Sequence, residues 1–353
     1  MKISQLETPA LYLDLDAFER NQKKMAQRLN KFKIDMFPHY KSVKCTTIAH
    51  MQIAAGAKGI SCAKTEEAWD LAHAGIENIL IANQVTSLEN ISRVASLAGC
   101  CNLTVCIDDE KNIDDLSAAA SFYGTVIHCL VECNVGADRC GVNSKEEVLA
   151  LANKIAESPG LEFQGIQAYA GQISHELDFT IREKVSIEKE NYLKSIISFL
   201  NENQILVKRV TGVSTGSVQF RNADTVYTDV QVGSYAFMDA SYGKLGLEYE
   251  HSLFVLSSVM TVNEKFVIMD TGRKSVGVDQ AMPQIPGCNC EEINVSEEHT
   301  KLPADVLNAK VGDKIPIIPG HCCTTMNLHD YIYFVRDDKI IDRVEITSRG
   351  RSR

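Results

Sequence analysis

The feature that most constrains the fold is a regular alternation of short β-type runs and longer amphipathic runs between residue 10 and about residue 240. Strands that alternate with helices of this length are typical of βαβ units and a parallel sheet. The β-type runs, rich in Val, Ile, Leu and aromatic residues, are 10–15, 34–39, 59–63, 78–83, 102–108, 125–134, 161–170, 207–215 and 228–237.

Eight or nine such units favour a closed (β/α)8 barrel. The run 144–160 illustrates the helical segments, because Ser144 is a good N-cap and Pro159-Gly160 a good terminator. An open doubly wound sheet is the alternative, but no GxGxxG follows the first strand. The sequence therefore predicts an α/β barrel.

The pattern changes after about residue 250. Short β runs follow one another without a long helical segment between them, at 253–262, 265–272, 313–319, 331–336 and 339–346. This texture predicts a small all-β domain. We expect a barrel over residues 10–245 and a C-terminal β domain over residues 250–347. Residues 1–9 are expected to belong to the β domain as well.

Composition narrows the classes of function. The formal net charge of −10 disfavours binding to nucleic acid or to an anionic membrane, since both require a basic surface. No run approaches the roughly 18 apolar residues of a spanning helix, and the first residues lack the apolar core of a secretory signal. Twelve cysteines in such a chain read as reduced thiols. We expect a cytoplasmic protein that acts on small molecules.

In a parallel barrel, reactive groups gather where strands end. The run PHYKSVK (38–44) places Lys41 and Lys44 at such a point. A partly desolvated lysine amine can form a Schiff base with a carbonyl compound such as pyridoxal phosphate. A solvated or salt-bridged lysine is the alternative, and the run alone does not decide.

Other strand ends also carry polar groups. Arg139 can donate to an anionic oxygen or form a structural ion pair, and Tyr169 can point its hydroxyl into a pocket or pack as an ordinary half-buried tyrosine. Two glycine-hydroxyl loops, VSTGSV (213–218) and VQVGSYAF (230–237), follow the last two strands. Barrels often hold a phosphate there on backbone amides.

The β domain contains a candidate metal site. His321 and Cys323 are two positions apart in PGHCCTTMNLHD (319–330). On an extended segment their side chains point the same way, and an imidazole–thiolate pair suits zinc. Two ligands fit an open site completed by water or substrate. A buried histidine beside an inert thiol is the alternative.

Long stretches of the chain match one known family. They are ETPALYLDLDAFERNQKKM, then the run from PHYKSVK to GIENILIAN, then VECNVGADRCGV, VSTGSV, VQVGSYAFMDASYG and PGHCCTTMNLHD, in that order. The chain thus resembles the D-threonine aldolase/D-serine dehydratase family along essentially its whole length. The resemblance implies pyridoxal-phosphate enzymes with an alanine-racemase-like barrel and a β domain, which usually form homodimers.

The resemblance also implies residue roles. Lys41 would carry the cofactor, with Lys44 a bystander, and Arg139 would contact the phenolic oxygen of the cofactor. Tyr169 and Gln231 would lie near its ring nitrogen. The phosphate would be held by Thr215, Gly216, Gly233 and Ser234, and a divalent metal, Zn²⁺ with Mn²⁺ or Mg²⁺ as alternatives, by His321 and Cys323.

The chain departs from the family pattern at two places. Ser42-Val43 follows the lysine where the family usually has Thr-His, and Thr324 follows Cys323 where a proline is common. Any role of the family histidine must therefore be filled by another group.

The resemblance leaves several activities open. Dehydration of D-serine-type substrates gives a 2-keto acid and ammonia, whereas retro-aldol cleavage of D-threonine or D-3-hydroxyaspartate gives glycine and an aldehyde. Because His-x-Cys suits zinc and is more common in the dehydratases, the sequence leans towards dehydration. Racemisation and a non-catalytic pyridoxal-phosphate carrier are the other readings, and the β domain argues against the carrier.

Overall fold

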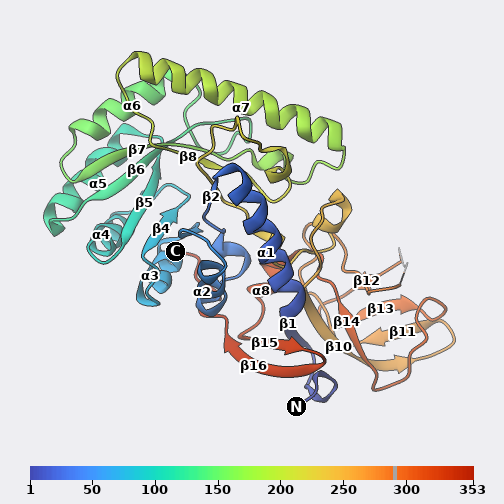
Figure 1. Ribbon diagram of the computed structural model, residues 1–353. Helices are drawn as coiled ribbons and strands as arrows, with labels where there is room; N and C mark the ends of the chain where they lie inside the picture. The colour runs from blue at the N-terminus through green and yellow to red at the C-terminus, as the bar shows by residue number, and fades with distance from the viewer. Residues whose placement is uncertain (289–291) are drawn as a thin grey trace. The chain divides into compact units, whose positions relative to one another are not determined.

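The computed structural model describes residues 1–288 and 292–353 and divides into two compact units (Figure 1). The barrel unit comprises residues 26–41, 48–233 and 351–353, and the sheet unit comprises 1–25, 42–47 and 234–350. Each unit is thus assembled from segments that are distant in sequence. The boundaries expected from the sequence treat the barrel as one continuous run and add only residues 1–9 to the C-terminal β domain.

The barrel unit is built on eight parallel strands in the order β2-β9-β8-β7-β6-β5-β4-β3. An isolated parallel bridge between His39, just after β2, and Ser61 in β3 joins the two edge strands. The prediction of a (β/α)8 barrel is therefore confirmed. The strands are β2 (Asp35–Met36), β3 (Ile60–Cys62), β4 (Asn78–Ile81), β5 (Asn102–Ile107), β6 (Ile127–Glu132), β7 (Leu161–Ala168), β8 (Arg209–Gly212) and β9 (Asp229–Val230).

Helices cover the outside of these strands (Figure 1). Ser144 caps α6 as expected: its Oγ accepts the Glu147 amide at 3.2 Å, while the Glu147 carboxylate accepts the Ser144 amide at 2.9 Å. The helices that follow the strands are α2 (Thr46–Ala54), α3 (Thr65–His73), α4 (Leu88–Leu97), α5 (Glu110–Tyr123), α6 (Lys145–Glu157) and α7 (Phe179–Glu202).

Apolar side chains fill the strand layer. Phe37, Leu80, Cys106 and Leu130 form one buried cluster, and the guanidinium of Arg209 lies 4.1 Å from the Phe37 ring centroid. Since strands buried on both faces need apolar residues at successive positions, the sequence runs read as almost continuously hydrophobic. This packing leaves the strand ends and the loops that follow them to carry polar groups.

The sheet unit contains an eight-stranded sheet in the order β12-β13-β11-β10-β1-β15-β16, with β14 also paired to β10. Its helices are the first part of α1 (Leu15–Phe32) and the short α8 (Cys322–Met326). The strands are β1 (Ala10–Asp14), β10 (Leu253–Val262), β11 (Phe266–Met269), β12 (Asn294–Val295), β13 (Thr300–Pro303), β14 (Lys314–Ile317), β15 (Tyr331–Arg336) and β16 (Lys339–Glu345).

The first strand differs from the sequence-based expectation. The sequence pattern places the run 10–15 among the barrel strands, but β1 pairs antiparallel with β10 and parallel with β15. A buried apolar run indicates a strand with neighbours on both sides, and it does not say which strands those neighbours are. Sequence continuity with the barrel therefore misassigned it.

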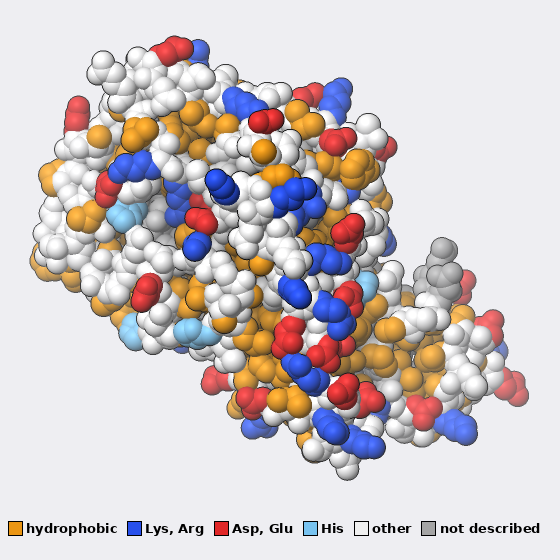
Figure 2. All heavy atoms as spheres, in the orientation of Figure 1, with side chains coloured by type: hydrophobic (Ala, Val, Ile, Leu, Met, Phe, Trp, Pro, Cys, Tyr) orange, Lys and Arg blue, Asp and Glu red, His pale blue; other side chains and the backbone are white. Residues whose placement is uncertain are grey.

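The surface carries charges of both signs. On the face drawn in Figure 2, Lys and Arg side chains are interspersed with Asp and Glu. Within the described residues no helix combines the length and the apolar character needed to cross a membrane.

Candidate active site

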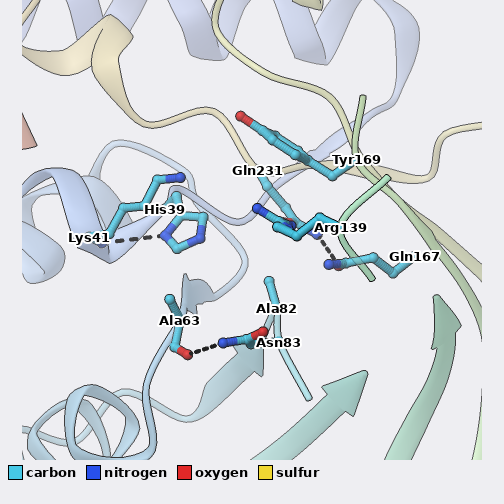
Figure 3. Close-up of a pocket in the computed structure, with 9 residues that line it drawn as sticks. All are labelled: His39, Lys41, Ala63, Ala82, Asn83, Arg139, Gln167, Tyr169 and Gln231. Atoms are coloured by element: carbon cyan, nitrogen blue, oxygen red, sulfur yellow. Dashed lines mark hydrogen bonds between the residues drawn. The ribbon is translucent and has the colours of Figure 1, made fainter. Parts of the chain in front are cut away.

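A pocket opens where the barrel strands end (Figure 3). Its cavity volume is about 160 Å³, which is smaller than most small-molecule sites. Its lining comes from the ends of β2, β3, β4, β6, β7 and β9 and consists of His39, Lys41, Ala63, Ala82, Asn83, Arg139, Gln167, Tyr169 and Gln231.

Lys41 reaches this pocket from the short 3-10 helix Tyr40–Ser42, in the segment that follows β2. Its backbone amide donates to His39 Nδ1 at 3.3 Å. Its Nζ lies 5.8 Å from the ring centroid of Tyr169, a cation–π distance that draws the amine towards the pocket (Figure 3). Lys41 is thus presented together with an aromatic ring and an imidazole.

Lys44 is held differently. It belongs to the sheet unit, has a left-handed backbone with φ of 44°, and its carbonyl accepts the Ser348 amide at 2.9 Å. Its Nζ lies 3.4 Å from the Ser348 carbonyl oxygen. Of the two lysines in PHYKSVK, Lys41 therefore lines the pocket.

Arg139 lines the same pocket from the loop after β6. Its side chain is 58% exposed, and its nearest carboxylate is Glu132, with Nη2 and Oε1 3.9 Å apart. At that distance and exposure the pair contributes little to stability, so the guanidinium remains available to an anionic ligand. Burial raises the pKa of Glu132, while a hydrogen bond from Gln84 and the charge of Arg139 act in the opposite direction.

A buried polar chain lies under the pocket. Gln231 Nε2 donates to Gln167 Oε1 at 2.6 Å and to Thr211 Oγ1 at 3.1 Å. Thr211 in turn donates to Asp229, which also accepts from Arg209 Nε at 2.7 Å. Both amide hydrogens of Gln231 are therefore used within the protein, and its carbonyl oxygen is the group left to accept a hydrogen bond from a ligand.

The predicted phosphate residues lie at the ends of β8 and β9. Thr215 and Gly216 are buried in the loop after β8, where Val213 has a left-handed φ of 66°, an unusual conformation for a β-branched residue. Gly233 lies in the segment after β9, and Ser234, the next residue, begins the segment 234–350 of the sheet unit. In the described part of the chain, the amides of Gly216 and Gly233 donate to no protein acceptor, which suits an anion cradle.

Glycine is required at position 216 by the packing. A Cβ there would lie 2.3 Å from the Ser174 carbonyl oxygen. The loop therefore passes so close to the segment after β7 that only a residue without a side chain fits.

The predicted metal pair lies in the sheet unit. His321 is the N-cap residue of α8 and has extended backbone angles, whereas Cys323 is already helical, so the extended geometry assumed from the sequence is wrong. The two side chains still meet, because the turn into the helix brings the thiol towards the imidazole. Cys323 Sγ also lies 3.3 Å from Ser42 Oγ.

Asp279 is a third member of this cluster. Its Oδ2 lies 2.7 Å from His321 Nδ1, and its Oδ1 accepts from Thr324 Oγ1 at 2.7 Å. Burial would lower the pKa of His321, but the hydrogen bond and charge of Cys323, together with those of Asp279, raise it to about 9. For Asp279, burial is outweighed by the hydrogen bonds from Thr324 and His321, which lower its pKa.

The donor set fits an open metal site with few protein ligands. An imidazole and a thiol side by side offer two ligands of the type that zinc accepts. Within residues 1–288 and 292–353, no group of three or more His, Cys, Asp and Glu side chains is arranged around one ion position. Water or substrate would therefore have to complete the coordination.

Sequence reasoning did not find four of these residues: His39, Asn83, Gln167 and Asp279. The first three follow or end barrel strands, so their position at a strand end was the available signal. Asp279 is 42 residues from His321, and nothing in its local sequence marks it.

Comparison with known proteins gives two family matches. Residues 13–241 match the model described as "Alanine racemase, N-terminal domain", and residues 252–335 match the "Putative serine dehydratase domain".

Among individual proteins, the chain is 36% identical to 3-hydroxy-D-aspartate aldolase of Paracoccus denitrificans, covering 99% of this chain and 94% of the relative. It is 37% identical to D-threonine aldolase of an Arthrobacter species, covering 99% and 95%.

Among solved structures, D-threonine aldolase from Filomicrobium marinum superposes with a TM-score of 0.96 at 35% identity, covering 100% of this chain and 98% of that one. D-threo-3-hydroxyaspartate dehydratase from Delftia sp. HT23 has the same fold, with a TM-score of 0.88 at 22% identity and 98% of each chain covered.

Proposed function

The chain belongs to the alanine racemase N-terminal domain family, with a serine dehydratase-type domain following it, and is an enzyme of the lyase type. From this premise we propose that it is a pyridoxal-phosphate aldolase. It would cleave D-3-hydroxy amino acids such as D-threonine or D-3-hydroxyaspartate to glycine and an aldehyde.

One observation of the site carries the cofactor assignment. Lys41 presents its amine in a pocket that also holds the ring of Tyr169 and the guanidinium of Arg139. A Schiff-base lysine needs an open approach for a carbonyl compound, and this pocket provides one. The two orphan amides at Gly216 and Gly233 support a phosphate cradle at the strand ends.

The choice of aldol cleavage over dehydration rests on the relatives. The two curated relatives that are 36% and 37% identical over 99% of this chain are named as aldolases. The D-threo-3-hydroxyaspartate dehydratase of a Delftia species is 24% identical over 91% of the chain. This support outweighs the lean towards dehydration drawn from His321 and Cys323.

Pyridoxal phosphate, when bound, withdraws electrons from the Cα of an amino acid and so weakens the bonds to that carbon. The side chains around it would have distinct tasks. Lys41 would anchor the cofactor and return a proton to Cα, Arg139 would neutralise an anionic oxygen, and the Gln231 carbonyl oxygen would accept a hydrogen bond from the ring. The hydroxyl proton of the substrate needs a base. His39 lines the pocket next to Lys41, but its Nδ1 accepts the Lys41 amide, so His39 would take the proton only once that hydrogen bond opens.

A divalent metal on His321 and Cys323 would supply Lewis acidity towards the substrate hydroxyl. The support is the adjacency of imidazole and thiol. Zinc suits this pair, with Mn²⁺ or Mg²⁺ as the alternatives. One solved structure with the same fold, at 22% identity, is named as a cysteine-to-alanine mutant of D-threo-3-hydroxyaspartate dehydratase in the metal-free form.

The test is a product assay. Purified protein is incubated with D-threonine, D-3-hydroxyaspartate and D-serine, with and without a metal chelator, and glycine, aldehyde and 2-keto acid are measured. We expect glycine and aldehyde in equal amounts from the first two substrates, and loss of both with chelator. Keto acid without glycine would show that dehydration is the activity, and turnover that resists chelator would remove the metal from the mechanism.

Homodimer formation and a cytoplasmic location remain predictions of the sequence. A sedimentation measurement on the purified protein tests the first.

A further inference from the structure

Two loops of the sheet unit approach each other closely around the predicted metal pair. A Cβ at Gly277 would lie 2.1 Å from Thr324 Oγ1, and a Cβ at Gly320 would lie 1.9 Å from the Ala281 carbonyl oxygen. The Gly277 amide also donates to Thr325 Oγ1 at 2.9 Å. Glycine at both positions therefore lets the segment 277–281 lie against the start of α8.

This close approach brings Asp279 to the imidazole. The carboxylate lies 2.7 Å from His321 Nδ1, on the side of the ring away from Nε2. An ionised carboxylate only accepts hydrogen bonds, so Nδ1 must carry the hydrogen. The nitrogen that remains for a metal is then Nε2.

The second oxygen of Asp279 is also engaged. Thr324 Oγ1 donates to Asp279 Oδ1 at 2.7 Å and is fixed by the same turn that positions the imidazole. Because one carboxylate oxygen accepts from the His321 imidazole and the other from the Thr324 hydroxyl, Asp279 is arranged to orient the metal ligand His321. It is not arranged to be a ligand itself.

We propose that Asp279, held by Thr324, is a positioning residue that fixes His321 with Nε2 directed at a divalent metal. This inference rests on the metal pair of the proposed function. It adds Asp279 and Thr324 as the residues that control the affinity of that pair for the metal. A carboxylate that accepts from the far nitrogen of a metal-bound histidine fixes the tautomer and the ring orientation. Thr324 has a specific part, because its hydroxyl donates to the Asp279 carboxylate and holds it in place.

The expected loss of metal affinity on substitution of Asp279 follows from the geometry. Loss of such an outer partner typically weakens metal binding by about 10-fold to 100-fold. The Asp279 side chain is 49% exposed, so water competes for its hydrogen bonds and we expect the lower end, about 10-fold. The Cys323 thiol should be affected least, because its Sγ lies 3.3 Å from Ser42 Oγ, a contact that substitution of Asp279 leaves in place.

The test is a metal-affinity measurement on the full chain. Protein stripped with chelator is titrated with Zn²⁺ in competition with a chromogenic chelator. The variants are Asp279→Ala, Asp279→Asn, Thr324→Val, Thr324→Ser and, to test the metal pair itself, His321→Ala. Asp330→Ala is the matched control, because it removes an exposed carboxylate of the same segment that pairs with Arg349.

We expect Asp279→Ala to bind Zn²⁺ about 10-fold more weakly, with Asp279→Asn between it and the parent protein. Thr324→Val should also weaken binding, whereas Thr324→Ser keeps the hydroxyl and should restore the affinity. Asp330→Ala should bind as the parent does. With Co²⁺ in place of Zn²⁺, the thiolate charge-transfer band should persist in Asp279→Ala, which reports that Cys323 still binds.

Two results would overturn the inference and tell its failure from that of the proposed function. If His321→Ala weakens Zn²⁺ binding but Asp279→Ala does not, the metal pair stands and the positioning role is wrong. If His321→Ala itself leaves Zn²⁺ affinity unchanged, the metal pair is wrong and the positioning role falls with it. Equal melting temperatures of the metal-free variants exclude a merely structural effect.

Discussion

At the scale of single residues, two lysines with the same chemistry differ in their surroundings. Lys41 and Lys44 are three residues apart, yet one lines the barrel pocket and the other is tied to the Ser348 carbonyl in the sheet unit. The amine near the Tyr169 ring is the one that a carbonyl compound in the pocket can reach. The short 3-10 helix Tyr40–Ser42 therefore decides which of the two lysines faces the pocket.

A substitution of each lysine tests this separation. We expect Lys41→Ala to lose the visible absorbance of bound pyridoxal phosphate and to lose activity by on the order of a thousandfold or more, because the anchor and proton carrier is gone. Absorbance spectra and product assays on purified protein measure both.

Lys44→Ala is the matched control and should keep colour and activity. If Lys41→Ala stayed yellow and active while Lys44→Ala did not, the roles of the two lysines would have to be exchanged.

At the scale of elements, close packing restricts which residues the loop after β8 can contain. The loop after β8 passes the Ser174 carbonyl so closely that a methyl group at residue 216 would overlap it. The same loop holds one of the two orphan amides. The proposed binding of an anion would therefore be coupled to packing in this segment.

We expect Gly216→Ala to destabilise the fold by about 1–3 kcal/mol, as overpacking does, and to weaken retention of pyridoxal phosphate. Thermal melting and dialysis of the holoenzyme measure the two effects. The control is Gly99→Ala, where a Cβ would meet its nearest atoms at 3.3 Å. A Gly216→Ala protein with unchanged melting and unchanged cofactor retention would contradict the cradle.

In the sheet unit, close packing makes strand β1 important for stability. It lies between β10 and β15, and Leu13 in it is fully buried. Leu13→Ala should therefore destabilise the protein by about 2–5 kcal/mol, since a buried leucine truncation leaves a cavity.

The comparison variant is Leu88→Ala in α4, which is 70% exposed and should change stability by less than about 0.5 kcal/mol. Urea denaturation followed by circular dichroism measures both. Equal midpoints for the two variants would mean that β1 is not a core strand.

At the scale of the whole molecule, binding of the cofactor should increase the free energy of unfolding. A ligand that binds only the folded chain stabilises it by about 2.7 kcal/mol at 100 times its dissociation constant. We therefore expect the melting temperature to rise with added pyridoxal 5′-phosphate, and to rise less with pyridoxal, which lacks the phosphate that the Gly216 and Gly233 amides would hold.

Calorimetry of the full chain with each compound measures this difference. Equal shifts with the two compounds would argue against a phosphate cradle, and no shift with either would argue against the cofactor.

Much of the molecule follows from the sequence because the governing signals are local. Alternating strand and helix patterns determine a barrel, since each βαβ unit is specified by its own hydrophobic period and its own caps, such as Ser144. The strand-end rule likewise pointed to Lys41, Arg139 and Tyr169, which line one pocket.

The tertiary structure decided what depends on distant partners. It assigned β1 to the sheet unit, because pairing with β10 and β15 joins residues more than 200 positions apart. It also brought Asp279 to His321 across 42 residues, through two loops that only glycine lets approach. Local propensity carries no information about such contacts, because they arise only when separate segments pack against each other.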